Sequence, residues 1–395
     1  MKAVNRVVSV AALLCLAAGT LPAGAAHAAT APTPQPATIV NAEAPGAVPD
    51  SYLVLLDDGI RADDTELTAR HGVTVLDTYT HAVDGYHVRA TEEQALALAA
   101  DPAVLAVERD TLVEAADLVQ PQPPSCGLDR IDQPDLPLDG AYRYPDSAGA
   151  GVTVYVVGTG IRYTHQDFGG RAQPGYDAGG GDGSDENGHG THLAGTVGGA
   201  SHGVAKASTL VSVKVLDAGG AGSVAGVVGG IDWLTENADG PAVAALSIGG
   251  APSEALDAAV RASIAAGVTY AVAAGNSAAD AGNFSPSRVT EAVTSAASSC
   301  DDRAGSASNH GQAVDLYAPG VDIVSTWHAS DTATATLSGT ASAAAHVAGV
   351  ATLYLGDHPT AGPADVWAAI DAAAVLDRLT GVPAGTPNKL LQVVD

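Results

Sequence analysis

The strongest constraint on folding is an alternation, beyond residue 127, of short apolar segments with amphipathic ones. Residues 152–157 (VTVYVV) are largely apolar, and Ser253 precedes a stretch in which apolar side chains recur every four residues until Gly267. Residues 268–274 are apolar again. This order predicts a strand, a helix capped by Ser253 and a further strand. Repeated βαβ units predict a parallel sheet covered by helices on both faces.

Ligand sites in such sheets lie at the carboxyl ends of the strands. Four glycine-rich or polar segments stand at predicted strand ends or helix starts: 158–160 (GTG), 187–192 (NGHGTH), 273–276 (AAGN) and 338–342 (SGTAS). We therefore expect the functional residues of the large domain to come from these segments.

The region before residue 127 divides into four parts by composition. Residues 1–28 are interpreted as a signal peptide, because basic residues precede an apolar run and small residues surround His27. Residues 29–48 and 117–125, rich in Ala, Pro and Thr or in Pro and Gln, are expected to be linkers. Between them, residues 49–116 are predicted to form a small domain, and residues 126–395 the large one. Export predicts a secreted, extracellular protein, and no later apolar run is long enough to cross a membrane.

The small domain is predicted to be α+β. Strands are expected at residues 51–56, 73–79 and 104–107, and a helix at 61–71. Thr91 and Gln94 have the spacing of a capping box, which predicts a second helix that ends before Pro102.

Charge and cysteine content limit the partners and the compartment. The formal net charge of −27 makes binding to a phosphate backbone unfavourable, so nucleic acid is excluded as an expected partner. After removal of a signal peptide, Cys126 and Cys300 remain. In an oxidising compartment they could form one disulfide or remain as two separate thiols, and the sequence leaves both possibilities open.

Three motifs carry a resemblance to a known family: 188–199 (GHGTHLAGTVGG), 213–217 (VKVLD) and 273–276 (AAGN). On these motifs, residues 128–354 resemble the subtilisin family of serine peptidases, and its proteinase K-like branch most closely. The resemblance implies an α/β fold with a parallel sheet flanked by helices. It also implies that residues 49–116 are an inhibitory prodomain of the small α+β, ferredoxin-like kind.

The resemblance assigns roles to four residues and raises a contradiction. His189 matches the catalytic base and Asn276 the side-chain donor of the oxyanion hole. Gly158, however, stands where the family has the orienting Asp, and Ala341 where it has the nucleophilic Ser. Neither can do that chemistry, so we expect an inactive homologue. The alternative is an active secreted endopeptidase with a rebuilt triad.

Nearby residues offer little compensation for these losses. Ser342 follows the nucleophile position by one residue, about 100° around a helix, and is expected to point away from His189. Ala345 replaces the Pro that the family has before His346.

Binding of extended peptide is also implied by the resemblance. The family's substrate-flanking strands correspond to Gly219, Gly220, Ala221, Gly222 and Ser223, and to Ser247, Ile248 and Gly249. The expected partners are the protein's own prodomain and extended peptide or protein segments.

Two groups of residues have side chains or carbonyl groups that suit a metal ion. His189, His192 and Asp185 could bind zinc, but the resemblance gives the first His a catalytic and the second a structural role. The acidic loop at Asp182, Asp185 and Glu186 is interpreted as a solvated turn. By resemblance, Asp315 and the carbonyl groups of Thr290 and Ala292 correspond to a structural calcium site. No cofactor is expected for the chemistry.

Overall fold

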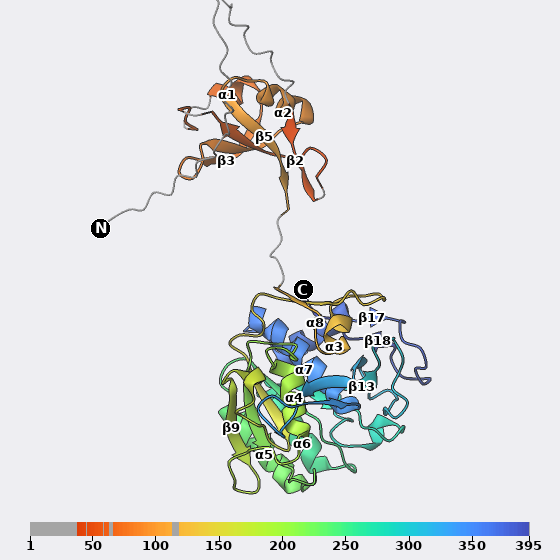
Figure 1. Ribbon diagram of the computed structural model, residues 1–395. Coiled ribbons are helices and arrows are strands. Elements are labelled where there is room, and N and C mark those ends of the chain that lie inside the picture. The colour runs from red at the N-terminus through yellow and green to blue at the C-terminus, as the bar shows by residue number, and fades with distance from the viewer. Residues whose placement is uncertain (1–37, 45, 58, 63–65, 113–117, 395) are drawn as a thin grey trace, which may run out of the picture. The chain divides into compact units, whose positions relative to one another are not determined.

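The computed structural model describes residues 38–394 except 45, 58, 63–65 and 113–117, and it divides into two compact units, Met1–Glu114 and Ala115–Asp395 (Figure 1). The expected signal peptide and residues 29–37 of the first expected linker lie outside the described residues.

The small unit is a five-stranded sheet covered on one face by helices. Its strands are β1 (Ile39–Val40), β2 (Ala47–Leu56), β3 (Thr74–Tyr79), β4 (Gly85–Arg89) and β5 (Val104–Thr111), in the order β1-β5-β2-β4-β3. Helices α1 (Glu66–Arg70) and α2 (Glu92–Ala99) supply Leu67 and Leu98 to a core that includes Tyr52. The capping box predicted at Thr91 and Gln94 is present.

Both expected linkers are shorter than composition suggested. Ile39 and Val40 pair in parallel with Val107 and Glu108, and β2 begins at Ala47. In the second expected linker, residues 117–125, strand β6 (Leu118–Pro121) pairs antiparallel with β7 (Ala141–Tyr144). Strand pairing depends on a partner that is remote in sequence, so a Pro-rich composition alone assigned these residues wrongly.

The large unit is built on a nine-stranded sheet with the order β17-β18-β14-β13-β12-β11-β8-β10-β9. Every neighbouring pair is parallel except β17 with β18. The strands are β8 (Thr153–Gly158), β9 (Ala172–Asp177), β10 (Thr209–Lys214), β11 (Ala242–Leu246), β12 (Thr269–Ala273), β13 (Val293–Ser298), β14 (Leu316–Pro319), β17 (Val375–Leu376) and β18 (Lys389–Leu390).

Helices cover both faces of this sheet, as the sequence predicted. Alternate residues of β8 face opposite layers, because Val154 and Val156 belong to one apolar core and Tyr155 and Val157 to another. The first core includes side chains of α4 (His189–Gly198), α7 (Thr340–Asp357) and α8 (Pro363–Ala373). The second includes α5 (Val224–Asn237) and α6 (Glu254–Ala265), and Ser253 caps α6 through the backbone N–H of Leu256.

The remaining elements of the large unit are short. They are α3 (Cys126–Ile131), the hairpin β15 (Ile323–Thr326) and β16 (Thr334–Leu337), and the 3-10 turns Gln166–Phe168 and Ala281–Asn283. Cys126 and Cys300 form a disulfide that joins the start of α3 to the segment after β13. Arg130, fully buried in α3, adds an ion pair to Asp302 at 2.6 Å. Helix α3, near the start of the large unit, is therefore held in place by a disulfide and an ion pair.

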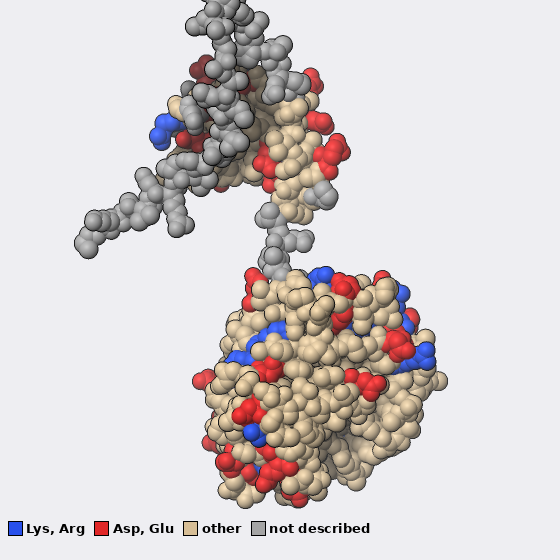
Figure 2. All heavy atoms as spheres, in the orientation of Figure 1, with Lys and Arg blue, Asp and Glu red and all other residues tan. Residues whose placement is uncertain are grey.

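Two further observations concern membrane-spanning helices and surface charge. Among the residues that the structure describes, no helix is both long and apolar enough to cross a membrane. Figure 2 shows Asp and Glu side chains spread over the visible face of the large unit rather than gathered into one patch.

Candidate active site

The structure places His189 at the first position of α4, after a turn built by Asp185. One carboxylate oxygen of Asp185 accepts hydrogen bonds from the backbone N–H groups of Asn187 and Gly188, both at 2.9 Å. The other accepts from the backbone and hydroxyl of Thr191 at 2.9 and 2.6 Å. Burial raises the pKa of the Asp185 carboxyl, but these hydrogen bonds outweigh it and leave the pKa below its usual value.

Asp185 is therefore a half-buried structural residue, and the expectation of a solvated turn is wrong for it. Its carboxylate also accepts from the Thr159 hydroxyl at 2.9 Å, and that hydroxyl accepts from the Gly190 N–H at 2.9 Å. The end of β8 and the start of α4 are thus joined through one acidic side chain. The sequence gives no signal for this role, because an acidic residue in a polar loop is typical of a solvated turn.

The surroundings of the His189 ring favour its neutral form. Burial lowers the pKa of His189, and the nearby negative charge of Asp185 opposes this only in part. His192, one turn along α4, is fully buried and its Nε2 lies 3.1 Å from the Ile323 carbonyl oxygen. Burial lowers the pKa of His192 to about 4. Within the described residues, no group of three His, Cys, Asp or Glu side chains is placed to hold a metal ion.

Gly158 ends β8 beside the start of α4. Its carbonyl oxygen accepts from the backbone N–H groups of Val215 and Leu216 at 2.9 and 3.1 Å. A Cβ built on Gly158 would meet only the Gly190 Cα, at 3.9 Å, which is ordinary contact. A side chain at position 158 therefore has room beside the first turn of α4.

Ala341 and Asn276 meet at the N-terminus of α7. Gly339, with φ of +153°, precedes this helix, a conformation that favours glycine. Thr340 donates its backbone N–H to Oδ1 of Asn276 at 2.9 Å, and its hydroxyl accepts from the Gly275 N–H at 3.0 Å. With Oδ1 engaged, the amide Nδ2 is the group of Asn276 that remains to donate to a ligand.

His189, Asn276 and Ala341 line one pocket of about 330 Å³, together with residues of the β11 and β12 strand ends. Ser342 does not line it and is 2% exposed. The structure thus brings the candidate base, the candidate oxyanion donor and the nucleophile position together, and directs Ser342 into the core.

A second pocket of about 540 Å³ shares His189, Ser247, Ile248 and Gly249 with the first. Gly220, Ala221 and Gly222 form its other wall. Six of the eight residues expected to flank a peptide therefore line this pocket. Gly219 instead donates its N–H to Asp217 within a turn, and Ser223 caps α5 through Gly226.

The residues of the expected calcium site lie at the start of neighbouring strands. Asp315 precedes β14, Ala292 precedes β13, and Asp315 Oδ2 accepts from the Thr294 N–H at 2.8 Å. Burial raises the pKa of Asp315 to about 6. The positive charge of Lys389 lowers this pKa and the negative charge of Asp371 raises it, but burial is the largest cause.

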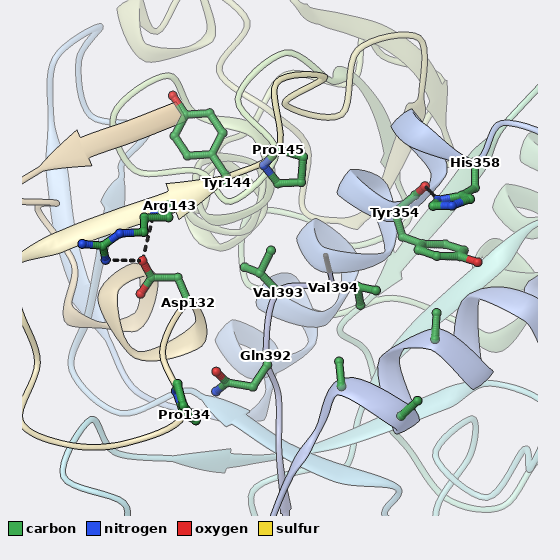
Figure 3. Close-up of a pocket in the computed structure, with 13 residues that line it drawn as sticks. Asp132, Pro134, Arg143, Tyr144, Pro145, Tyr354, His358, Gln392, Val393 and Val394 are labelled. Atoms are coloured by element: carbon green, nitrogen blue, oxygen red, sulfur yellow. Dashed lines mark hydrogen bonds and ion pairs between the residues drawn. The ribbon is translucent and has the colours of Figure 1, made fainter. Parts of the chain in front are cut away.

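A separate pocket of about 670 Å³ lies between β7, α7, α8 and the residues before the C-terminus (Figure 3). None of the candidate site residues lines it. Asp132 is its buried acid, paired with Arg143, and burial raises the pKa of Asp132 to about 6.

The fold and this site define a class of protein: a parallel α/β protein whose candidate base, candidate oxyanion donor and candidate peptide-flanking segments line two adjoining pockets. The family model for the subtilase family matches residues 149–390, and the peptidase inhibitor I9 model matches residues 51–116. The chain belongs to the subtilase family and carries an inhibitor-type prodomain.

Similar proteins agree with this assignment. The "Extracellular serine proteinase" of Thermus sp. (strain Rt41A) is 43% identical over 382 residues, covering 90% of this chain and 92% of that protein. The "Alkaline serine exoprotease A" of Vibrio alginolyticus is 40% identical, covering 93% of this chain and 72% of that protein. The crystal structure of a cold adapted subtilisin-like serine proteinase has a TM-score of 0.66 and 46% identity, covering 68% of this chain and 98% of its own. The resemblance inferred from the sequence motifs is confirmed.

Proposed function

We propose that this protein is a secreted subtilisin-type homologue that has lost peptide-bond hydrolysis and retains a peptide-binding cleft. The observation that carries the proposal is the identity of two residues beside His189. Gly158 ends β8 and Ala341 lies in the first turn of α7, at the two places where the family has its carboxylate and its nucleophile.

The chemistry of these two residues supports inactivity. Ala341 has no oxygen or sulfur to attack a carbonyl carbon, and Gly158 has no group to accept a hydrogen bond from the imidazole. In subtilisin, loss of the nucleophile lowers turnover about 10⁶-fold. The remaining oxyanion hole and binding contacts account for only about 10³- to 10⁴-fold acceleration over water.

The cleft supports peptide binding. Gly220, Ala221 and Gly222 face Ser247, Ile248 and Gly249 across the 540 Å³ pocket. An extended peptide between two such segments gains main-chain hydrogen bonds as an added strand, which requires no nucleophile. Asn276 Nδ2 is available to donate to a carbonyl group of this peptide.

The protein's own prodomain is the first proposed occupant. Family members of this type remove the prodomain by self-cleavage, so a chain without the triad is expected to keep it attached. A tethered segment competes at high effective concentration with any added peptide. Extended peptide or protein segments from other molecules are the second class of partner.

An active endopeptidase with a rebuilt triad is the second candidate, because the named relatives are proteinases. A serine-directed fluorophosphonate separates the two. We expect no covalent labelling of the purified chain, and labelling that is lost on heat denaturation would establish the active alternative.

Two further features belong to the proposal. Secretion is supported by residues 1–28 and by the extracellular relative. Structural calcium is supported by the buried carboxyl of Asp315, with the carbonyl oxygens of Thr290 and Ala292 as the other protein ligands. A calcium ion there would act on stability and not on chemistry.

A further inference from the structure

Cys126 and Cys300 are joined by a disulfide to which the proposed function gives no role. Gly127 follows Cys126 in α3. A Cβ built on Gly127 would clash with Nε2 of His346 in α7 and would lie 3.1 Å from the Cβ of Pro319, the last residue of β14. The α3 backbone therefore packs directly against α7 and against the end of β14.

The segment that precedes Cys300 contacts the residue that follows β14. Ser298 ends β13, and its carbonyl oxygen accepts a hydrogen bond from the backbone N–H of Gly320 at 2.8 Å. Ser298 lies two residues before Cys300. The disulfide thus closes a ring of contacts, in which the end of β14 touches the neighbours of both cysteines.

This ring of contacts continues to the start of α7. The carbonyl oxygen of Gly320 accepts a hydrogen bond at 2.6 Å from the backbone N–H of Gly339, the residue that precedes α7. The next residue, Thr340, donates its backbone N–H to Oδ1 of Asn276 at 2.9 Å. The end of β14 therefore helps to place the start of α7, and with it the Asn276 amide that borders the 330 Å³ pocket.

Other contacts hold α3 when the disulfide is open. Arg130 is fully buried and pairs with Asp302, two residues after Cys300, at 2.6 Å. Leu128 and Ile131 are fully buried in the core of the large unit. Opening of the bond should therefore loosen α3 without unfolding this unit. Both cysteines are half-buried, so the core does not enclose the bond.

We propose that the bond between Cys126 and Cys300 is a redox-sensitive switch for peptide binding in the cleft, a role that rests on the proposed function. In the oxidised chain, the closed ring holds the start of α7 where the Asn276 amide can donate to a bound peptide. In the reduced chain the ring is open, the start of α7 is held less firmly, and the affinity for peptide falls.

The switching step is thiol–disulfide exchange with a dithiol. One thiolate of the dithiol attacks a sulfur of the protein disulfide, and the other cysteine leaves as a thiolate that takes up a proton. The second thiol of the reagent then displaces the first, which forms a cyclic disulfide and frees the second cysteine. Two electrons and two protons pass from the dithiol to Cys126 and Cys300.

The switch is tested on the full chain by fluorescence anisotropy. The probe is a fluorescein-labelled peptide with the sequence of residues 107–116 (VERDTLVEAA), and dithiothreitol is the dithiol. Reduction should raise the apparent dissociation constant about 10-fold, as expected if about one reduced molecule in ten has the binding arrangement. Reoxidation should restore it. Cys126→Ser with Cys300→Ser is the matched control, which should bind weakly with or without dithiothreitol.

The ring of His346 gives a second readout. Burial lowers the pKa of His346 to about 4, and Gly127 lies against its Nε2. When α3 loosens, water reaches this nitrogen and the pKa should rise towards its ordinary value of 6.5. NMR of the chain with isotope-labelled histidine measures the titration in both redox states, and His346→Gln assigns the signal.

The outcomes separate the switch from the proposed function. Equal peptide affinity in the oxidised and the folded, reduced chain would overturn the switch and leave the proposed function intact. Unfolding on reduction would also overturn it, because the bond would then only stabilise the fold. An unchanged titration of His346 would exclude the route through α3. Absence of peptide binding by the oxidised chain would remove the proposed function, and the switch with it.

Discussion

The backbone N–H of Thr340 donates to Oδ1 of Asn276 at 2.9 Å, and this contact fixes the amide beside the first turn of α7. It orients Nδ2 as the free donor, although the adjacent residue Ala341 has no nucleophilic atom. The side of the site that would stabilise an oxyanion is thus organised, while the groups that would generate one are missing.

The first prediction is that two substitutions restore hydrolysis. Gly158→Asp with Ala341→Ser should cleave a chromogenic peptide measurably, because position 158 has room for a side chain beside Gly190, the residue that follows His189. Each single variant is the control. Gly158→Asp alone should remain inactive, and Ala341→Ser should be slower by about 10⁴-fold than the double variant. A folded double variant without activity would show that the scaffold no longer supports the triad.

The second prediction concerns Asn276 in that double variant. Asn276→Ala should lower kcat by about 10²- to 10³-fold with a small change in KM, because an oxyanion donor acts mainly in the transition state. Asn276→Asp is the matched control, since it keeps an acceptor for the Thr340 N–H but lacks the donor. Equal loss in both variants assigns the effect to the donor. Full activity in Asn276→Asp would exclude the role.

The third prediction is that the prodomain stays attached. In a protease-deficient host, the mass of the exported chain should correspond to an N-terminus near Ala29, because no triad is present to cleave the prodomain from the large unit. The double variant should release its small unit. An N-terminus between residues 113 and 126 in the unaltered chain, generated by the chain itself, would contradict inactivity.

Binding between the two units is tested with separately expressed pieces. A large unit beginning at Leu118, so that β6 is kept, should bind the separately expressed small unit and be displaced from it by extended peptides. Calorimetry is the measurement, and heat denaturation of each piece shows that it is folded. Two folded pieces that do not associate would remove the proposed role of the cleft.

The fourth prediction concerns pH and calcium. Burial raises the pKa of Asp315 to about 6, above the ordinary value of 3.8. The folded state then binds the proton more tightly than the unfolded state, so chelated protein should lose stability as pH rises from about 4 to about 6. Calcium should reverse that loss above pH 6. Thermal unfolding with and without chelator measures both effects.

Two variants separate the contributions to this profile. Asp315→Asn should remove the calcium response and part of the pH dependence. Asp132→Asn is the control, because burial also raises the pKa of Asp132 to about 6 at a site remote from the proposed ligands. It should reduce the pH dependence and leave the calcium response intact. A calcium response unchanged in Asp315→Asn would contradict the proposed site.

The sequence predicted those helices and strands whose signals lie within a short stretch of the chain. Ser253, Gly267 and the four-residue spacing between them define α6, and Thr91 with Gln94 defines the start of α2. Pairing between remote segments was not predictable in this way. The strands at 39–40 and 118–121 exist only through their partners, and the Cys126 to Cys300 bond joins residues 174 positions apart.

The candidate site was likewise predicted in part from the sequence. His189, Asn276 and the positions of Gly158 and Ala341 were predicted from motifs, and the structure brings His189, Asn276 and Ala341 into one pocket. The buried role of Asp185 was missed, because an acidic residue in a polar loop gives no sign that five donors will surround it.

Hydrolysis by the purified, unaltered chain tests the central claim most directly. The measurement is cleavage of casein and of a chromogenic peptide, with and without a serine-directed inhibitor. The expected result is no cleavage above buffer, with Gly158→Asp and Ala341→Ser together giving inhibitor-sensitive activity in the same assay. Turnover by the unaltered chain that the inhibitor abolishes would contradict the assignment of Gly158 and Ala341 as lost catalytic positions.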